Sequence, residues 1–151
     1  MVFRIFKILL FGSLLIIASC SSDDGCTNEA MNVMDLMDFG CQNPVANVTV
    51  NSLNEFELIR SQEDYVAIVT DRCSPSVDWQ QYDLVAGTVV LLRGLESIEK
   101  ALRMNCELNR LELTFTIRLS ITQEAPQITL NAVIPKLQDN VDIYVDRVVI
   151  E

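Results

Sequence analysis

The chain has 151 residues, of which 50% are hydrophobic, and its 21 acidic residues outnumber its 11 lysine and arginine residues to give a formal net charge of −10. This length is typical of one domain with a modest core, and the negative charge repels nucleic acid and anionic lipid, so we expect no nucleic-acid partner. Histidine is absent, which removes the usual general base and the usual metal ligand from the candidate chemistries.

The first 19 residues have the order of a bacterial lipoprotein signal peptide. Two basic residues precede an apolar run over residues 8–18, which at about 1.5 Å per residue is too short for the ~30 Å hydrocarbon core of a bilayer. Residues 17–20, Ile-Ala-Ser-Cys, resemble a lipobox, in which small residues precede a cysteine that receives a thioether-linked lipid. We therefore expect residues 1–19 to be removed and Cys20 to carry a membrane anchor. The alternative is an ordinary secretory signal, with Cys20 as a passive thiol.

Residues 20–28 follow as an acidic tether. It begins with Ser21, Ser22, Asp23 and Asp24, directly after the cysteine. This stretch resembles the Ser/Asp-rich segment that directs Bacteroidota lipoproteins to the outer face of the outer membrane, and a plain solvated spacer is the alternative. We expect a lipid-anchored protein of the outer membrane, at the cell surface or on the periplasmic face.

Short elements are predicted for the first half of the domain. Apolar residues share one helical face over residues 28–39, and Gly40 ends that predicted helix. Residues 45–50 and 55–59 have the pattern of short strands. Ser61 is a candidate cap for a helix that runs to about residue 70, with two acidic residues in its first turn.

Longer strands are predicted for the second half. Residues 84–92 are almost continuously apolar, which indicates a central strand covered on both faces. Apolar and polar residues alternate without error over residues 110–122, which predicts a long half-buried strand, and residues 128–134 repeat the pattern. A last strand begins at Val141, and its change of phase at residues 146–147 predicts a bulge.

Residues 95–106 fit either a helix or a strand. Leu95, Ile98 and Leu102 have helical spacing, whereas Ile98, Leu102, Met104 and Cys106 fit a strand. In total the patterns predict about seven strands and one or two short helices. Residues 29–151 are therefore expected to form a single mainly β domain, either a sandwich or a rolled antiparallel sheet.

The cysteines after Cys20 favour two disulfides, because an even number of cysteines enters an oxidising compartment. They are Cys26, Cys41, Cys73 and Cys106, and three pairings can be drawn. We predict Cys73–Cys106, which joins the loop before Trp79 to the residue before the long strand, and Cys26–Cys41 by elimination. The second bond conflicts with the predicted helix, since twelve helical residues rise ~18 Å whereas bridged Cα atoms lie ~6 Å apart.

Residues 77–87, VDWQQYDLVAG, resemble a motif of small uncharacterised Bacteroidota lipoproteins. These are similar in turn to the C-terminal domain of the protease-complex B subunit, a non-catalytic companion of a surface protease. Residues 59–64 and 134–137 match as well, residues 40–41 match more weakly, and the resemblance covers roughly residues 40–145. It implies a β-rich, membrane-anchored accessory domain without catalytic residues or a cofactor, with an envelope protein as partner.

One sequence match to catalytic chemistry is the pair Ser97 and Lys100. A Ser-x-x-Lys motif serves penicillin-binding enzymes when one helical turn sets the serine beside the lysine. If residues 95–106 form a strand, this spacing points the two side chains to opposite faces. The Ser-Asp-Asn and Lys-Thr-Gly partners of that fold are also absent.

Carboxylates supply the remaining candidates. The pairs are Glu63 with Asp64 and Asp78 with Asp83, and a calcium candidate consists of Asp139, Asn140 and Asp142. A paired carboxylate serves a hydrolase only where its surroundings shift its pKa, which a sequence does not reveal. A polar turn before the last strand explains the calcium candidate more simply, so we expect no metal site.

Trp79 and Tyr82 permit a functional and a structural interpretation. Three residues apart, they could form an exposed surface on which a sugar ring or a peptide stacks. The buried strand over residues 84–92 follows immediately, however, so a turn at residues 78–81 would bring both rings onto the edge of the core. We expect packing.

Two functional hypotheses follow from these residues. The favoured one is a lipid-anchored, non-catalytic binding or accessory module of the cell envelope. The alternative is a small carboxylate-dependent hydrolase. A stable protein partner would support the first, and turnover of glycans without a partner would support the second.

Replacing Cys20 with alanine should abolish lipid attachment, because the sulfur of Cys20 is the predicted acceptor. Growth with labelled palmitate should mark the wild-type chain and leave Cys20→Ala unlabelled. Label on Cys20→Ala would contradict the predicted anchor.

Overall fold

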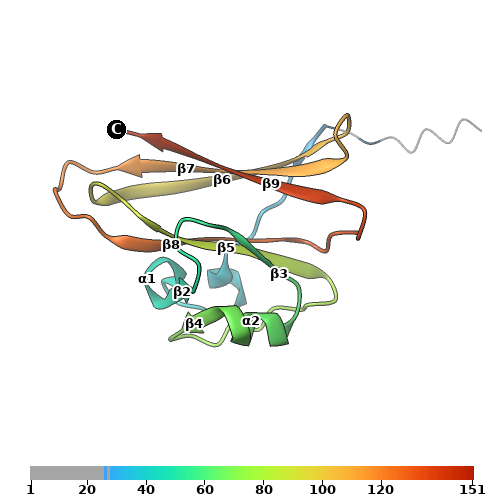
Figure 1. The fold of residues 1–151 in the computed structure, drawn as a ribbon, viewed down its shortest axis with the longest axis horizontal. Helices are drawn as coiled ribbons and strands as arrows, with labels where there is room; N and C mark the ends of the chain where they lie inside the picture. The colour runs from blue at the N-terminus through green and yellow to red at the C-terminus, as the bar shows by residue number, and fades with distance from the viewer. Residues whose placement is uncertain (1–25, 27) are drawn as a thin grey trace, which may run out of the picture.

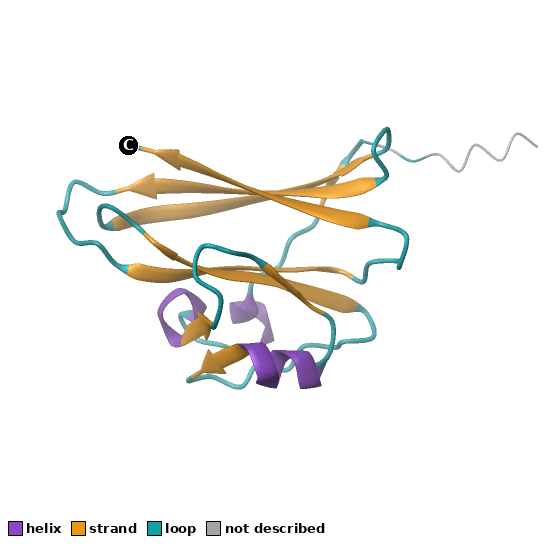
Figure 2. Ribbon diagram, in the orientation of Figure 1, coloured by secondary structure: helices purple, strands orange, loops and turns teal. Residues whose placement is uncertain are grey.

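The computed structural model describes residue 26 and residues 28–151, which fold into three layers (Figure 1, Figure 2). The first layer is a four-stranded sheet in the order β1 (Ala30–Met31), β6 (Leu95–Asn105), β7 (Arg110–Leu119), β9 (Asp142–Ile150). The second is a three-stranded sheet in the order β3 (Glu57–Ile59), β5 (Tyr82–Val90), β8 (Gln127–Pro135). The third layer contains β2 (Val48–Val50), β4 (Val69–Asp71), η1 (Leu36–Phe39), α1 (Pro44–Asn47) and α2 (Gln62–Ile68). The fold is a mainly β sandwich with a few short helices, as predicted.

The inner core lies between the two larger sheets. Leu113, Phe115 and Ile117 of β7 are fully buried, and the polar residues between them face outward. Phe56 stacks on Phe115 with ring centroids 5.4 Å apart. The period-two pattern predicted for this strand is confirmed, because only one face of the four-stranded sheet is covered.

The three-stranded sheet is covered on both faces. Seven consecutive residues of β5 and seven of β8 are buried. Side chains of one parity enter the inner core, and those of the other parity enter a second core beneath η1, α2 and β2. The central position predicted for residues 84–92 is thus confirmed.

The segment before Gly40 is extended over most of its length, so the helix predicted over residues 28–39 is wrong. Met31 pairs with Leu102 of β6, and Met34 bridges Val133 of β8. The apolar residues therefore connect the edges of two different sheets instead of lining one helical face. Only η1 is helical, as a single 3-10 turn that Asp35 caps and Gly40 ends at φ +92°.

The other short elements agree in part with the sequence. The strand predicted at residues 45–50 begins as the helical turn α1, with Pro44 in its first turn, and only Val48–Val50 form β2. Helix α2 is confirmed, with Ser61 Oγ accepting a 3.1 Å hydrogen bond from the Asp64 N–H. The ambiguous stretch over residues 95–106 is strand β6.

Strand β9 departs from the sequence analysis in two ways. It pairs with β7 in a parallel orientation, whereas an antiparallel sheet was predicted. Its register runs without a shift from Asp142 to Ile150, so the predicted bulge at residues 146–147 is wrong. As an edge strand β9 can leave Val148 and Ile150 exposed on the outer face, which makes a repair of the phase unnecessary.

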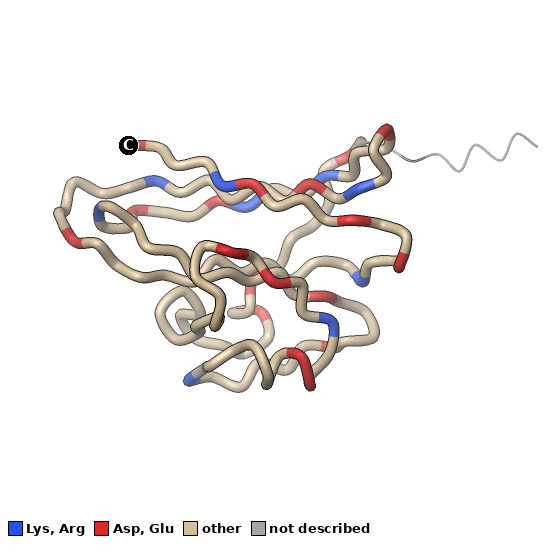
Figure 3. Tube along the Cα trace, viewed as in Figure 1, with Lys and Arg blue, Asp and Glu red and all other residues tan. Residues whose placement is uncertain are grey.

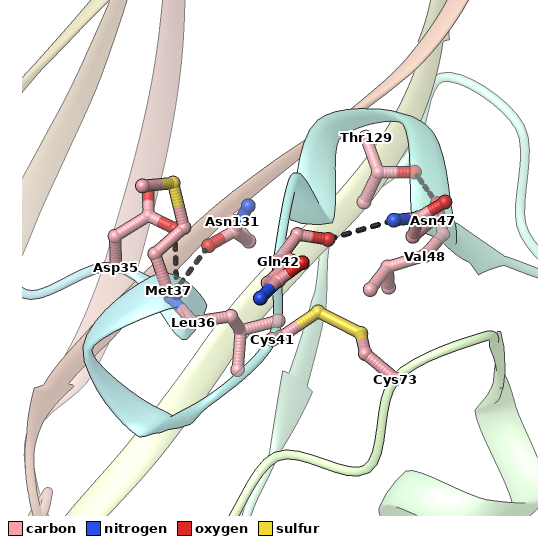
Figure 4. Close-up of a disulfide and its surroundings, with 10 residues drawn as sticks. All are labelled: Asp35, Leu36, Met37, Cys41, Gln42, Asn47, Val48, Cys73, Thr129 and Asn131. Atoms are coloured by element: carbon pink, nitrogen blue, oxygen red, sulfur yellow. Dashed lines mark hydrogen bonds between the residues drawn. A yellow bond between two sulfur atoms is a disulfide. The ribbon is translucent and has the colours of Figure 1, made fainter.

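The four described cysteines form two disulfides, but the predicted pairing is wrong. The bonds are Cys26–Cys106 and Cys41–Cys73, with Cα atoms 5.7 Å and 5.0 Å apart. The extended segment that contains β1 pairs with β6, which brings Cys26 close to Cys106 directly after β6. Gly40 ends η1 and turns the chain so that Cys41 faces the loop after β4. Figure 4 shows Cys41–Cys73 beside Leu36 of η1. The conflict between a Cys26–Cys41 bond and a helix over residues 28–39 does not arise, because neither the bond nor the helix forms.

The outer face of the four-stranded sheet carries a charge cluster centred on Glu112. Figure 3 shows basic and acidic residues along the strands of this sheet. Glu112 accepts hydrogen bonds from Asn105 Nδ2 at 2.8 Å, Arg103 Nε at 2.8 Å and Arg110 Nη2 at 3.0 Å. The hydrogen bond from Asn105, followed by those from the two arginines, lowers the pKa of Glu112 from 4.5 to about 2. The ionised carboxylate therefore stabilises the folded chain.

Replacing Glu112 with glutamine should remove a stabilisation that depends on pH. Because the folded pKa lies below the unfolded value, the contribution is complete above pH 4.5 and is lost as the pH falls through about 2. Urea denaturation of both proteins between pH 2 and 7 should therefore give curves that converge only in acid. The control Glu99→Gln removes an exposed carboxylate whose nearest cation, Arg118, is 3.5 Å away. A constant difference between Glu112→Gln and wild type across this pH range would contradict the assignment.

Candidate binding cleft

A cleft of about 750 Å³ opens between the two larger sheets at the end of the sandwich where Cys26 lies. In Figure 1 this is the end where β9 begins. Its lining residues come from the segment around β1, the adjoining ends of β6 and β7, and the connection between β8 and β9. We call it the N-terminal cleft.

The N-terminal cleft has an apolar floor and a polar rim. The floor consists of Met31, Met104, Leu111, Leu137 and Val141. The rim consists of Glu29, Asn109, Lys136, Gln138 and Asn140. A concave apolar surface with a few polar groups is the usual form of a ligand site.

Two tight connections shape the rim. Asn109 adopts a left-handed conformation at φ +47° and closes the turn between β6 and β7. Its side-chain amide donates a 2.8 Å hydrogen bond to the carbonyl of Asn140 in the connection between β8 and β9. Asparagine tolerates this backbone conformation better than most residues. The two connections are thereby held together across the cleft mouth.

A buried carboxylate fixes the wall of the N-terminal cleft. Asp83 of β5 is fully buried and accepts hydrogen bonds from Lys136 Nζ at 2.6 Å and from the Leu137 N–H at 2.9 Å. Arg60 Nε lies 3.5 Å from the same carboxylate, and Arg60 Nη2 donates to the Leu137 carbonyl at 2.8 Å. Because a buried charge is costly without partners, this network holds the chain after Pro135 in one position.

The catalytic candidates are surface groups or have structural partners, and Glu63 and Asp64 are exposed in the first turn of α2. Asp83 is engaged by its three structural partners, and Asp78 accepts from the N–H of Gln80 and from the Gln81 amide. Ser97 and Lys100 lie three residues apart on strand β6, so their side chains point to opposite faces, and Lys100 pairs with Asp35. Neither pair forms a nucleophile with an adjacent base.

Two of the three residues of the calcium candidate have other partners. Asp139 is fully exposed and lies 3.3 Å from Arg60 Nη1, and the carbonyl of Asn140 receives the Asn109 amide. Among the described residues, no three aspartate, glutamate or cysteine side chains come together as a metal site.

Trp79 contacts the second core. Its ring is half-buried, lies 6.0 Å from the ring of Tyr65, and donates through Nε1 to Gln62 Oε1 at 3.1 Å. The N–H groups of Gln81 and Tyr82 both donate to the Asp78 carbonyl, which forms the turn predicted at residues 78–81. The packing interpretation therefore fits the structure better than an exposed platform.

The predicted anchor lies outside the described residues. These positions are Cys20, Ser21, Ser22, Asp23 and Asp24. No helix in the described part of the chain is long and apolar enough to cross a membrane. The N-terminal cleft was not predicted from the sequence. Its one local signal is Asp83, an aspartate inside the apolar run at residues 82–90, which needs hydrogen-bond donors or a cation nearby.

The chain matches no protein-family model, and neither the curated proteins nor the solved structures contain a detectable relative. The resemblance to Bacteroidota lipoproteins remains a prediction.

Replacing Asp83 with asparagine should destabilise the domain by about 3 kcal/mol or more, because Lys136 and Arg60 would lose the carboxylate that compensates their charges. The matched control is Asp139→Asn, which removes a fully exposed carboxylate from the same Arg60 and should leave the stability almost unchanged. Equilibrium denaturation measures both variants. Equal stabilities would show that Asp83 does not hold the wall.

Proposed function

We propose that this chain is a lipid-anchored envelope lipoprotein whose folded domain acts as a non-catalytic binding or accessory module. The lipobox-like sequence before Cys20 supports the anchor, and the two disulfides fit an oxidising compartment. An envelope protein that inserts an apolar protrusion into the N-terminal cleft is the proposed partner.

The position of Cys26 carries this proposal. Cys26 lines the N-terminal cleft and is bonded to Cys106 at the end of β6. It follows the predicted lipid-bearing Cys20 by six residues, which span at most about 20 Å when fully extended. A partner bound in the cleft would therefore lie next to the membrane surface, where other anchored envelope proteins are found.

The chemistry of the cleft favours binding over turnover. The apolar floor offers burial to a partner side chain, and the amides and charges of the rim offer hydrogen bonds. The carboxylate behind the cleft wall, Asp83, is fully buried and already holds Lys136, Leu137 and Arg60. This engagement supports a positioning role for Asp83.

Filling the N-terminal cleft should weaken partner binding. Gln138 is exposed on the rim, so Gln138→Trp would occupy the opening without disturbing the core. Affinity capture of the anchored protein from solubilised envelopes should recover a specific partner with wild type and at least tenfold less with Gln138→Trp.

The matched control is Gln123→Trp, at an exposed position in the connection between β7 and β8 at the opposite end of the sandwich (Figure 1). It should retain the partner. Equal recovery with Gln138→Trp would exclude the cleft as the binding site. If no partner is recovered and the purified chain turns over a glycan library, the hydrolase hypothesis would replace this proposal.

A further inference from the structure

Strand β9 is hydrogen-bonded on one side only in the described part of the chain, since it ends the order β1-β6-β7-β9. Met31 pairs with β6 and Met34 bridges β8, so β1 and β8 share one edge of the sandwich and β9 and β3 share the other. At this second edge β9 has nine residues, whereas β3 has three. Most of β9 therefore extends along an open edge.

The outer edge of β9 presents free backbone groups. The Arg147 N–H is held by Asp146 Oδ1 at 2.8 Å and so points away from β7. In a parallel pair alternate residues share this orientation, which assigns the groups of Ile143, Val145 and Val149 to the open edge as well. Because β9 ends the order of the sheet, no strand in the described part of the chain pairs with this side of it. An incoming strand could pair with this row.

The usual protections of an edge strand are weak in β9. The strand contains no proline, glycine or lysine, and its register has no bulge. Natural edge strands are commonly shielded by such features, and an unshielded edge pairs readily with another chain. The one protective feature is Arg147, which shares the inward parity of its partner Phe115. Val148 and Val149 are 41% and 47% exposed.

An apolar pocket of about 350 Å³ opens beside this edge. The lining residues are Val90 of β5, Leu91 and Leu92 directly after it, Leu119 of β7, Arg147 and Val149 of β9, and Glu151 directly after β9. It exists because the cover of β5 on this side ends at Thr88, where Leu53 forms an isolated bridge. An inward-facing side chain of an added strand would enter this pocket.

The charges on the outer face of β9 favour an added strand that carries basic side chains. Asp142 and Asp146 lie four residues apart on the outer face, and neither forms an ion pair within the described residues. Residues directly opposite on adjacent strands interact, so basic side chains would be favoured across from both aspartates.

Self-pairing is disfavoured in the registers that would set like charges opposite each other. An antiparallel pair of β9 strands related by a two-fold axis through Asp146 would set Asp146 opposite Asp146. An axis through Arg147 would set Arg147 opposite Arg147. Like charges directly opposite destabilise a pair of strands.

We propose that β9 accepts an extended segment of a partner protein as a fifth strand of the four-stranded sheet. The segment carries lysine or arginine on the outer face, across from Asp142 and Asp146. On the inner face it carries apolar side chains, one of which fills the pocket beside Val149. Backbone pairing supplies the affinity and the alternate side chains supply the specificity. This surface is separate from the N-terminal cleft.

The probes are two capped heptapeptides, one alternating lysine and valine and the other alternating glutamate and valine. Isothermal titration with the full domain should detect binding of the lysine peptide and not of the glutamate peptide. Val149→Pro removes a backbone N–H that points away from β7, so it should abolish binding while the sheet remains intact. Unchanged binding to Val149→Pro, or no binding of the lysine peptide to wild type, would overturn the proposal.

A charge reversal tests the register independently of proline. Asp146→Lys should weaken binding of the lysine peptide at least tenfold and favour the glutamate peptide. The matched control, Glu63→Lys on exposed α2, makes the same change in net charge away from the edge and should have less than a twofold effect. Equal losses in both variants would show non-specific attraction and overturn the proposal. A concentration-dependent dimer that Val149→Pro abolishes would also overturn the proposal, because a second copy of this chain would then be what pairs with β9.

Discussion

The structure depends on a three-stranded sheet that is buried on both faces. Three of its buried polar side chains bond to the third layer: Thr88 Oγ1 accepts the Val50 N–H at 2.7 Å, and Thr129 Oγ1 donates to the Val48 carbonyl at 2.6 Å. Asn131 Oδ1 accepts the Leu36 N–H at 3.2 Å (Figure 4). Because an unpaired polar group in such a place would be costly, these bonds attach the third layer to the sheet.

The two candidate surfaces follow from where this arrangement stops. The inner core closes fully only where both large sheets overlap, so the connections at one end leave the N-terminal cleft, with Asp83 fixing its wall. Along the side of the sandwich where β3 and β9 lie, β3 is shorter than β9, and the four-stranded sheet keeps an open edge at β9. The first surface lies beside Cys26, near the predicted anchor, and the second runs along β9. The two surfaces are separate, so the accessory module that we propose could engage a membrane neighbour and an extended segment independently.

Local patterns predicted the parts of this fold that local physics decides. The apolar run around Leu84 and the cap at Ser61 each reflect one strand or one helix end, and both were confirmed. The alternation over residues 110–122 was confirmed as far as Leu119, whereas Ile121 lies beyond the strand and is exposed. The disulfide pairing, the parallel orientation of β9 and the N-terminal cleft depend on contacts between distant segments. Ala30 and Met34 mislead for the same reason, since their spacing suits one helical face but they pair with strands of different sheets.

The central claim is that the third layer is part of one cooperative unit with the sandwich, and native-state hydrogen exchange tests it most directly. The Leu36 and Val50 amides lie outside the two large sheets but donate into the central one. The account predicts that both exchange only through global unfolding, with the same free energy as the Leu113 amide of β7. Exchange of Leu36 and Val50 through a smaller opening, while Leu113 stays protected, would show a detachable layer and contradict the account.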